Sequence, residues 1–276
     1  MTSLDHSKLA DQLLIPVLEA GAATMRHRRA GVAVESKADL SPVTAADREA
    51  EEIILAALAK FAPGIPVIAE EAMSRGEASA VAQSFFLVDP LDGTKEYVKG
   101  GTDFTVNIGL IVDRVPVFGM IYAPAIDQLT MTLGSRRAAE VKISPEARPA
   151  GLSALQLTDI QTREPDPQRL VAVGSKSHRT AGDSAFQADP RITGYREIGS
   201  SLKFWLVARG EADIYPRFGP TCEWDTAAGH AIVLAAGGAV TASGGGPFLY
   251  GKAETGFINS PFTVWGRTSL ISQFSL

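Results

Sequence analysis

Apolar side chains recur at intervals of three and four residues in two N-terminal stretches, residues 9–25 and 50–61. This spacing places them on one face of a helix, so both stretches are predicted to be amphipathic helices. Thr44 is suited to the N-cap of the second helix, and Pro63 followed by Gly64 predicts its end. The polar segment between the two helices, residues 35–42, is expected to be a loop.

Short runs rich in β-branched and aromatic residues predict strands in the following part of the chain. They cover residues 65–69, 85–88, 104–112 and 115–122. Within the third run, apolar positions alternate with smaller or polar ones, which predicts a half-buried antiparallel strand. Asp113 and Arg114 form the short connection to the fourth run, which indicates a β-hairpin.

Strand and helix patterns alternate in the C-terminal half. Strands are predicted at residues 170–173 and 212–215, and helices at residues 201–209 and 226–236. Because strands gather first and alternate with helices later, the predicted fold class is a mixture of α+β and α/β.

The length of 276 residues predicts two domains or one two-lobed unit. The periodic pattern weakens across residues 135–168, so we place a boundary near residue 160. The expected parts are an N-terminal α+β part with an antiparallel sheet, residues 1–160, and a C-terminal α/β part, residues 161–276.

The composition, with 45% hydrophobic and 21% charged residues, excludes collagen-like, disordered and coiled-coil classes. A single cysteine, Cys222, excludes a disulfide framework and any multi-cysteine zinc or iron–sulfur site. It is compatible with a reducing compartment. The net charge of −5 argues against a protein that binds nucleic acid. The negative net charge does not exclude an anionic substrate, because a local pocket or a bound cation can make the electrostatic potential of a site positive.

No stretch approaches 18 uncharged apolar residues, so no transmembrane segment is predicted. Residues 9–22 resemble a signal peptide, but Asp11, Gln12 and Glu19 interrupt the apolar run and argue against that interpretation. We therefore expect a cytoplasmic protein. A peripheral position at the cytoplasmic face of the inner membrane and the choice between monomer and homodimer stay open.

Two carboxylates follow the strand predicted at residues 85–88, in the sequence Asp89-Pro90-Leu91-Asp92-Gly93-Thr94. We expect the strand to end at Asp89, because a proline does not continue it. Two carboxylates this close repel each other unless a cation lies between them, and a D-x-x-D turn suits Mg²⁺. The N–H groups around Gly93 and Thr94 could receive a phosphate. A surface turn built from Asp, Pro and Gly explains the same residues, so both interpretations stay open here.

Other acidic residues also lie at the ends of apolar elements. Glu70 and Glu71 are expected to end the strand at residues 65–69, Asp47 lies in the first turn of the second helix, and Asp225 precedes the last helix. Each has a simpler explanation. Glu70 and Glu71 could be a solvated strand end, Asp47 could be the acid of a capping box, and Asp225 could be an N-cap. Together they place carboxylates where sites are usually built, but spacing alone does not prove that they converge.

Several other chemistries are excluded by missing motifs. The sequence contains no G-x-x-x-x-G-K-[ST] and no H-E-x-x-H, and its four histidines are scattered. Ser200-Ser201-Leu202-Lys203 matches S-x-x-K, but S-D-N and K-T-G are absent, so a penicillin-recognising hydrolase is rejected.

Three motifs resemble those of the lithium-sensitive, magnesium-dependent phosphomonoesterases that include inositol monophosphatase. They are Ala69-Glu70-Glu71, Asp89-Pro90-Leu91-Asp92-Gly93-Thr94 and Trp224-Asp225-Thr226-Ala227-Ala228-Gly229. Their order and spacing are highly specific, and the likeness covers nearly the whole chain. Lys95-Glu96 and Tyr215-Pro216-Arg217-Phe218-Gly219-Pro220 are similar to the 3′(2′),5′-bisphosphate nucleotidase branch of this family. The resemblance implies no site residue within residues 135–168.

The resemblance implies a layered α-β-α-β-α sandwich and a site for two Mg²⁺ ions, with a weaker third. One ion would be bound by Glu70, Asp89 and the Leu91 carbonyl, and the second by Asp89, Asp92 and Asp225. Glu70 would also help to hold the third ion. Asp47 and Thr94 would orient the attacking water.

The implied activity is hydrolysis of the 3′-phosphate of adenosine 3′,5′-bisphosphate (PAP) to give AMP and phosphate. The sulfated relative, PAPS, is a further candidate substrate, and the implied role is PAP recycling in sulfur assimilation. The implied substrate-binding residues are Gly93, Thr94, His178, Ser200, Lys203 and Arg217. Ser200 and His178 also have simpler explanations than substrate binding: Ser200 could cap a helix, and His178 could be an ordinary histidine in a loop. Two alternatives stay open: another inositol or sugar phosphatase of the superfamily, and a non-catalytic module that binds metal or nucleotide.

Overall fold

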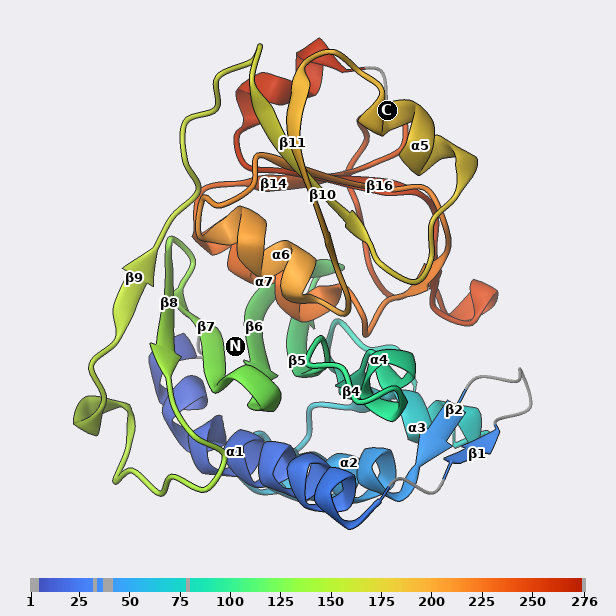
Figure 1. Cartoon of the computed structure of the whole chain (residues 1–276). Coiled ribbons are helices and arrows are strands. Elements are labelled where there is room, and N and C mark those ends of the chain that lie inside the picture. The colour runs from blue at the N-terminus through green and yellow to red at the C-terminus, as the bar shows by residue number, and fades with distance from the viewer. Residues whose placement is uncertain (1–4, 32–33, 37–41, 78–79, 275–276) are drawn as a thin grey trace.

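The computed structural model describes residues 5–31, 34–36, 42–77 and 80–274. Figure 1 shows five stacked layers, in the order helix, sheet, helix, sheet, helix. The helices of these layers are α1 (His6–Ala30) with α2 (Ala45–Phe61), then α6 (Leu202–Ala208) with α7 (Ala227–Ala235), then α5 (Ala181–Gln187). The predicted layered sandwich is confirmed.

A seven-stranded sheet lies between α1 and α2 on one face and α7 on the other. Its strands, in spatial order, are β3 (Val67–Ala69), β4 (Ser84–Asp92), β5 (Thr105–Val112), β6 (Val115–Ala123), β7 (Gln128–Gly134), β8 (Arg137–Lys142) and β9 (Thr158–Ile160). Only the β3–β4 pairing in this sheet is parallel. Asp113 and Arg114 both have positive φ and connect β5 to β6, so the predicted hairpin is confirmed.

A mixed five-stranded sheet covers the other face of α6 and α7. Its strands, in spatial order, are β11 (Ile192–Ile198), β10 (Leu170–Ser175), β12 (Ile214–Arg217), β16 (Phe262–Trp265) and β14 (Ala239–Ala242). Two small strand pairs join β1 (Val34–Ser36) to β2 (Pro42–Thr44) and β13 (Thr221–Cys222) to β15 (Ile258–Asn259). The remaining short helices are α3 (Glu70–Ser74), α4 (Thr94–Val98), η1 (Pro124–Ile126), η2 (Leu152–Ala154), η3 (Ala253–Thr255) and η4 (Thr268–Gln273).

The N-terminal helices follow from their predicted patterns and caps. Helix α1 begins after Asp5, whose side chain accepts hydrogen bonds from the Ser7 and Lys8 N–H groups. In α2, Thr44 is the N-cap and forms a capping box with Asp47. No helix within the described ranges is long and apolar enough to span a membrane.

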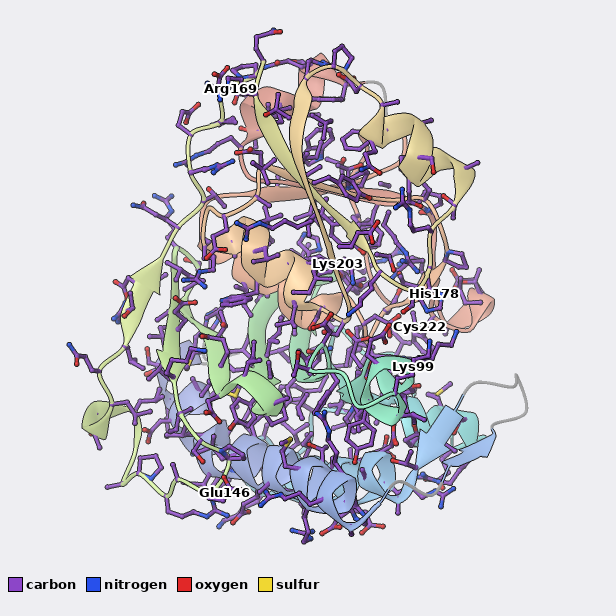
Figure 2. The ribbon with its side chains drawn as sticks, in the orientation of Figure 1. Lys99, Glu146, Arg169, His178, Lys203 and Cys222 are labelled. Atoms are coloured by element: carbon purple, nitrogen blue, oxygen red, sulfur yellow. The ribbon has the colours of Figure 1, made fainter. Side chains whose placement is uncertain are left out.

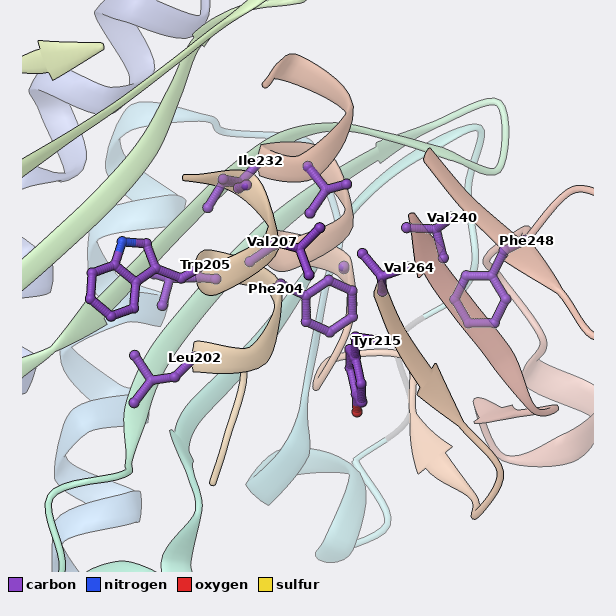
Figure 3. Packing of buried hydrophobic residues seen from close by; sticks show 14 of the residues in the cluster. Leu202, Phe204, Trp205, Val207, Tyr215, Ile232, Val240, Phe248 and Val264 are labelled. Carbon is purple, nitrogen blue, oxygen red and sulfur yellow. The ribbon is translucent and has the colours of Figure 1, made fainter. Parts of the chain in front are cut away.

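Close packing fixes α7 against the seven-stranded sheet. A Cβ at Gly119 of β6 would lie 2.1 Å from the Ala228 carbonyl oxygen, and one at Gly109 of β5 would lie 2.6 Å from the Ala227 Cβ. Only glycine therefore permits this approach of helix to sheet. Figure 3 shows the apolar core on the other side of α6 and α7, where Phe204, Tyr215 and Val264 pack together.

Two predictions about the acidic segments are wrong. Strand β4 does not end at Asp89 but continues through Pro90 to Asp92, with an irregular register against β5. Proline is tolerated at position 90 because β3 ends at Ala69, which pairs with Val88 of β4. No residue of β3 therefore lies beside Pro90 to accept a hydrogen bond from the N–H that proline lacks. Glu70 and Glu71 do not end a strand; they form the first turn of α3.

Other predicted boundaries and environments also differ. Strand β5 is buried on both faces rather than half-buried, because helices cover both sides of its sheet. Residues 35–42 are not simply a loop, because β1 and β2 take up both of its ends; residues 37–41 lie outside the described residues. Strand β12 begins two residues later than predicted.

Candidate active site

A cleft of about 450 Å³ collects most of the predicted site residues, although they are far apart in the sequence. It is lined by segments on both sides of the central helices, and Figure 2 places Lys203, His178 and Cys222 between the two sheets. The predicted residues that line it are Glu70, Asp92, Gly93, Thr94, His178, Ser200, Lys203, Arg217 and Asp225. A cleft of this size matches those that bind small molecules.

Glu70, Asp92 and Asp225 line this cleft, and their charges act on the carboxylate of Asp89, which is buried and is not among the lining residues. Burial raises the pKa of Asp89 well above its usual range, and the charges of Glu70, Asp92 and Asp225 raise it further. The pKa of Asp225 is raised in the same way, by burial and then by Asp92 and Glu70. Burial also raises the pKa of Asp92 to about 6, although Lys203 opposes the shift. Glu70, Asp92 and Asp225 therefore lie in one cleft and act on Asp89, and their mutual repulsion favours a cation between them; Asp47 and Glu71 are not among the residues that line the cleft.

The turn between β4 and α4 is held by its own polar groups. The Asp89 Oδ1 accepts a hydrogen bond from the Leu91 N–H at 3.0 Å, and the Leu91 carbonyl accepts one from the Thr94 hydroxyl at 3.1 Å. Gly93 has φ of 90°, and a Cβ there would lie 2.5 Å from the Asp103 carbonyl oxygen. The turn therefore requires glycine at this position.

Asp47 serves the helix and the cleft with different oxygens. Its Oδ2 accepts hydrogen bonds from the Thr44 N–H at 2.8 Å and the Thr44 hydroxyl at 2.7 Å. Its Oδ1 accepts one from the Thr94 hydroxyl at 3.4 Å, across 47 residues of sequence. The capping role and the predicted pairing with Thr94 therefore coexist.

Two cationic side chains, Lys203 and Arg217, line the same cleft as the carboxylates. The Lys203 Nζ donates to the Ile198 carbonyl at 3.4 Å and to the Ser200 carbonyl, and burial lowers the pKa of Lys203 to about 8. The Arg217 guanidinium donates to the carbonyls of Gly219 at 3.1 Å and Pro220 at 2.9 Å. These contacts hold both cations in place.

His178 and Ser200 differ in exposure. His178 is exposed at the surface of the cleft, and its partial burial followed by the charges of Lys95 and Arg217 lowers its pKa. Ser200 is buried with φ of 49°, and its hydroxyl has no hydrogen-bond partner among the described residues. Ser201, not Ser200, occupies the N-cap of α6, so the helix-cap explanation for Ser200 is wrong.

The sequence reasoning missed the polar contacts that join the two sides of the cleft. The Ser177 hydroxyl donates to Glu96, which lines the cleft, and the Ser201 hydroxyl donates to the Asn107 Oδ1 at 2.8 Å. The Lys176 Nζ lies 3.4 Å from the Asp103 Oδ2. Glu96 and Ser201 stand in the motifs Lys95-Glu96 and Ser200-Ser201-Leu202-Lys203, but no pattern links residues separated by 73 to 94 positions.

The donor chemistry of this cleft suits Mg²⁺, which prefers carboxylate and carbonyl oxygens. Glu70, Asp89, Asp92 and Asp225 supply carboxylates, and their charges interact directly. Within the described residues, however, no three His, Cys, Asp or Glu side chains already stand in an arrangement that would hold a metal ion. The residues fit the ion in chemical kind, and the assignment of individual ligands stays a prediction.

A layered fold with an acidic cleft between its sheets defines the class of protein. The chain belongs to the inositol monophosphatase family, whose model matches residues 9–269.

Within that family, the chain is similar to 3′(2′),5′-bisphosphate nucleotidases called CysQ. It is 44% identical to CysQ of Shigella flexneri over 231 residues, which cover 84% of this chain and 88% of that protein. It is 38% identical to CysQ of Buchnera aphidicola subsp. Acyrthosiphon pisum, with 92% of each chain covered. The crystal structure of CysQ from Bacteroides thetaiotaomicron matches with a TM-score of 0.78 and 35% identity, over 95% of this chain and 98% of that one. The predicted family resemblance is confirmed.

Proposed function

We propose that this chain is a Mg²⁺-dependent 3′(2′),5′-bisphosphate nucleotidase that hydrolyses the 3′-phosphate of PAP to give AMP and phosphate. The observation that carries the proposal is the meeting of the acidic residues with Lys203 and Arg217 in one cleft. The similarity to the CysQ proteins supports the same activity. PAPS is proposed as a second substrate, and PAP recycling in sulfur assimilation as the biological role.

The family is generally dependent on Mg²⁺, and we propose two ions with a weaker third. One would be held by Glu70, Asp89 and the Leu91 carbonyl, and another by Asp89, Asp92 and Asp225, with Glu70 also contributing to the third. When bound, such ions neutralise phosphate charge and lower the pKa of water.

Asp47 and Thr94 are proposed to position the attacking water. The Thr94 hydroxyl has one hydrogen and two acceptors within reach, the Leu91 carbonyl at 3.1 Å and the Asp47 Oδ1 at 3.4 Å. With that hydrogen turned to Asp47, a water that donates to the Thr94 oxygen has a hydrogen-bonded route to the carboxylate. Attack of the water oxygen on phosphorus breaks the bond to the 3′-oxygen. The proton from water passes through Thr94 to Asp47, and the departing oxygen takes a proton from solvent. No protein nucleophile is needed, because phosphoryl transfer depends mainly on positioning and charge.

The N–H groups of Gly93 and Thr94 are proposed to bind the scissile phosphate. The remaining residues of the cleft are proposed to bind the parts of the substrate that do not react. Lys203 and Arg217 suit the 5′-phosphate. The Ser200 hydroxyl, buried without a partner within the described chain, suits a substrate oxygen, and His178 suits the ribose.

Phosphate release from PAP, PAPS and inositol 1-phosphate, measured side by side with Mg²⁺ present, tests this proposal. We expect PAP to have the highest kcat/KM and Asp89→Asn to lose nearly all activity with each substrate. Faster turnover of inositol 1-phosphate would instead identify another phosphatase of the superfamily. Unchanged turnover by Asp89→Asn, or no turnover of any phosphate ester, would overturn the catalytic proposal.

The location and assembly of the protein remain proposals as well. We propose a cytoplasmic location. Cell fractionation distinguishes it from a peripheral position at the inner membrane, and sedimentation of the purified chain distinguishes a monomer from a homodimer.

A further inference from the structure

Ile258 is the large apolar side chain that remains accessible at the cleft. Phe204, Tyr215 and Trp224 also line the cleft, but they are 2%, 2% and 8% exposed, because they pack in the apolar core. Ile258 is 51% exposed. The other exposed large hydrophobic side chains of the described residues, Val81 and Val115, do not line the cleft. Ile258 therefore presents accessible apolar surface to a molecule bound in the cleft, and burying that surface on binding would be favourable.

The backbone around Ile258 is fixed on both sides. Phe257 is buried, with φ of 63° and its ring 6.1 Å from that of Trp224. Asn259 is also buried, and its Nδ2 donates to the Cys222 carbonyl at 2.9 Å and to the Thr221 hydroxyl at 3.1 Å. Asn259 is the other residue of β15 and points inward, so Ile258 points to the opposite side of the strand.

An ion pair with a buried carboxylate holds this segment against the turn that carries Asp225. The Lys252 Nζ lies 2.7 Å from the Glu223 Oε1 and 3.1 Å from the Asn259 Oδ1. Strand β15 pairs with β13, where Ile258 lies opposite Cys222, and the Cys222 N–H donates to the Asp225 Oδ2 at 2.8 Å. The apolar contact and the acidic residue are therefore parts of one rigid unit.

We infer that Ile258 contacts the nucleobase of the substrate and makes the enzyme selective for nucleotides over phosphate esters without a base. This inference rests on the proposed function. A nucleobase is the flat and least polar part of such a substrate, whereas the charged groups of the cleft suit its phosphates. A single aliphatic side chain in a concave wall is too small to dock a protein, which requires roughly 800 Å² on each partner.

Binding of two ligands that differ only in the base provides the first test. We expect Ile258→Ala to weaken AMP about three- to tenfold, as expected for losing part of an aliphatic contact, and to leave ribose 5-phosphate unchanged. Isothermal titration calorimetry measures both. Val115→Ala removes an exposed aliphatic side chain outside the cleft and should change neither affinity. Equal AMP affinities of Ile258→Ala and wild type, or equal weakening of both ligands, would overturn the inference.

Steady-state kinetics provide the second test. With PAP, Ile258→Ala should raise KM by the same factor and leave kcat unchanged, and Ile258→Phe should restore KM because a ring replaces the lost apolar surface. A fall in kcat with constant KM would overturn the role in base binding. Wild-type enzyme that does not hydrolyse PAP would refute the proposed function, whereas active wild type with unaltered Ile258 variants would refute this inference alone.

Discussion

Replacing Lys252 with methionine removes the partly buried cation that pairs with a fully buried carboxylate. The Glu223 side chain is 0% exposed, and the Lys252 Nζ lies 2.7 Å from its Oε1. The same ammonium group donates to the Asn259 Oδ1 and to the Leu249 carbonyl, so all three of its N–H groups are used. The substitution leaves a buried carboxylate and two further acceptors without this donor.

The expected cost follows from what Glu223 retains. Loss of one partner from a buried pair costs about 3 to 5 kcal/mol. Glu223 still accepts backbone hydrogen bonds from Gly251 at 2.7 Å and Lys252 at 3.0 Å, so we expect the lower limit, about 3 kcal/mol. A loss of that size lowers Tm by roughly 6 to 12 °C in a protein of this size class.

Equilibrium urea unfolding and calorimetry measure the change. The double variant Lys252→Met with Glu223→Gln should be at least about 1 kcal/mol more stable than Lys252→Met alone, because the uncompensated charge is gone. Arg137→Met is the matched control; it breaks an exposed pair with Asp159 at 3.0 Å and should cost less than about 1 kcal/mol. Lys252→Met within 1 kcal/mol of wild type, or a double variant showing the sum of the two single losses, would refute the argument.

Three other substitutions test separate features. Gly119→Ala should cost about 1 to 3 kcal/mol in urea unfolding, because its Cβ would meet the Ala228 carbonyl, while Gly134→Ala, with no atom within 4 Å, should cost less than 1 kcal/mol. Burial lowers the pKa of His230 to about 3 from 6.5, so the unfolded chain binds the extra proton between these values. Stability should therefore fall with decreasing pH in this window, by up to about 1.4 kcal/mol per unit for this group, and His230→Gln should lose less between pH 7 and pH 5.5. Thr94→Ala should lower kcat for PAP at least about 100-fold while Thr94→Ser keeps most of it; equal rates for the two would remove the hydroxyl from the mechanism.

The sequence predicted elements best where one element carries its own pattern. Helices α1 and α2 show the apolar spacing and capping residues that define them locally. Strands β8 and β9 were not predicted, because Arg137–Lys142 and Thr158–Ile160 are short, contain charged or small residues, and become strands through pairing with neighbours. Such pairing is a property of the assembled sheet rather than of the local residues.

The same distinction applies to the candidate site. The carboxylates were found because each lies at the end of an apolar element, as with Asp225 before α7. Glu223 and Lys252 lie in irregular segments, and Asn259 lies in the two-residue strand β15, which is too short to carry a periodic signal, although their contacts fix the turn that bears Asp225. Asp47 showed two acceptable interpretations in the sequence, and the structure shows why neither excluded the other: its two oxygens bond to different partners.

The third acidic motif combines chemistry with packing. Asp225 lines the cleft, and the next residues, Ala227 and Ala228, lie against the glycines of β5 and β6. The fit of α7 to the sheet thereby fixes where Asp225 stands relative to Asp89, whose strand β4 pairs with β5. A larger residue at Ala227 would meet β5 at Gly109, lift α7 from the sheet and move the carboxylate with it. Ala228 meets Gly119 through its backbone, so there the requirement for a small residue falls on the glycine of β6. The alanine at position 227 and the two sheet glycines are therefore required for the position of the acid.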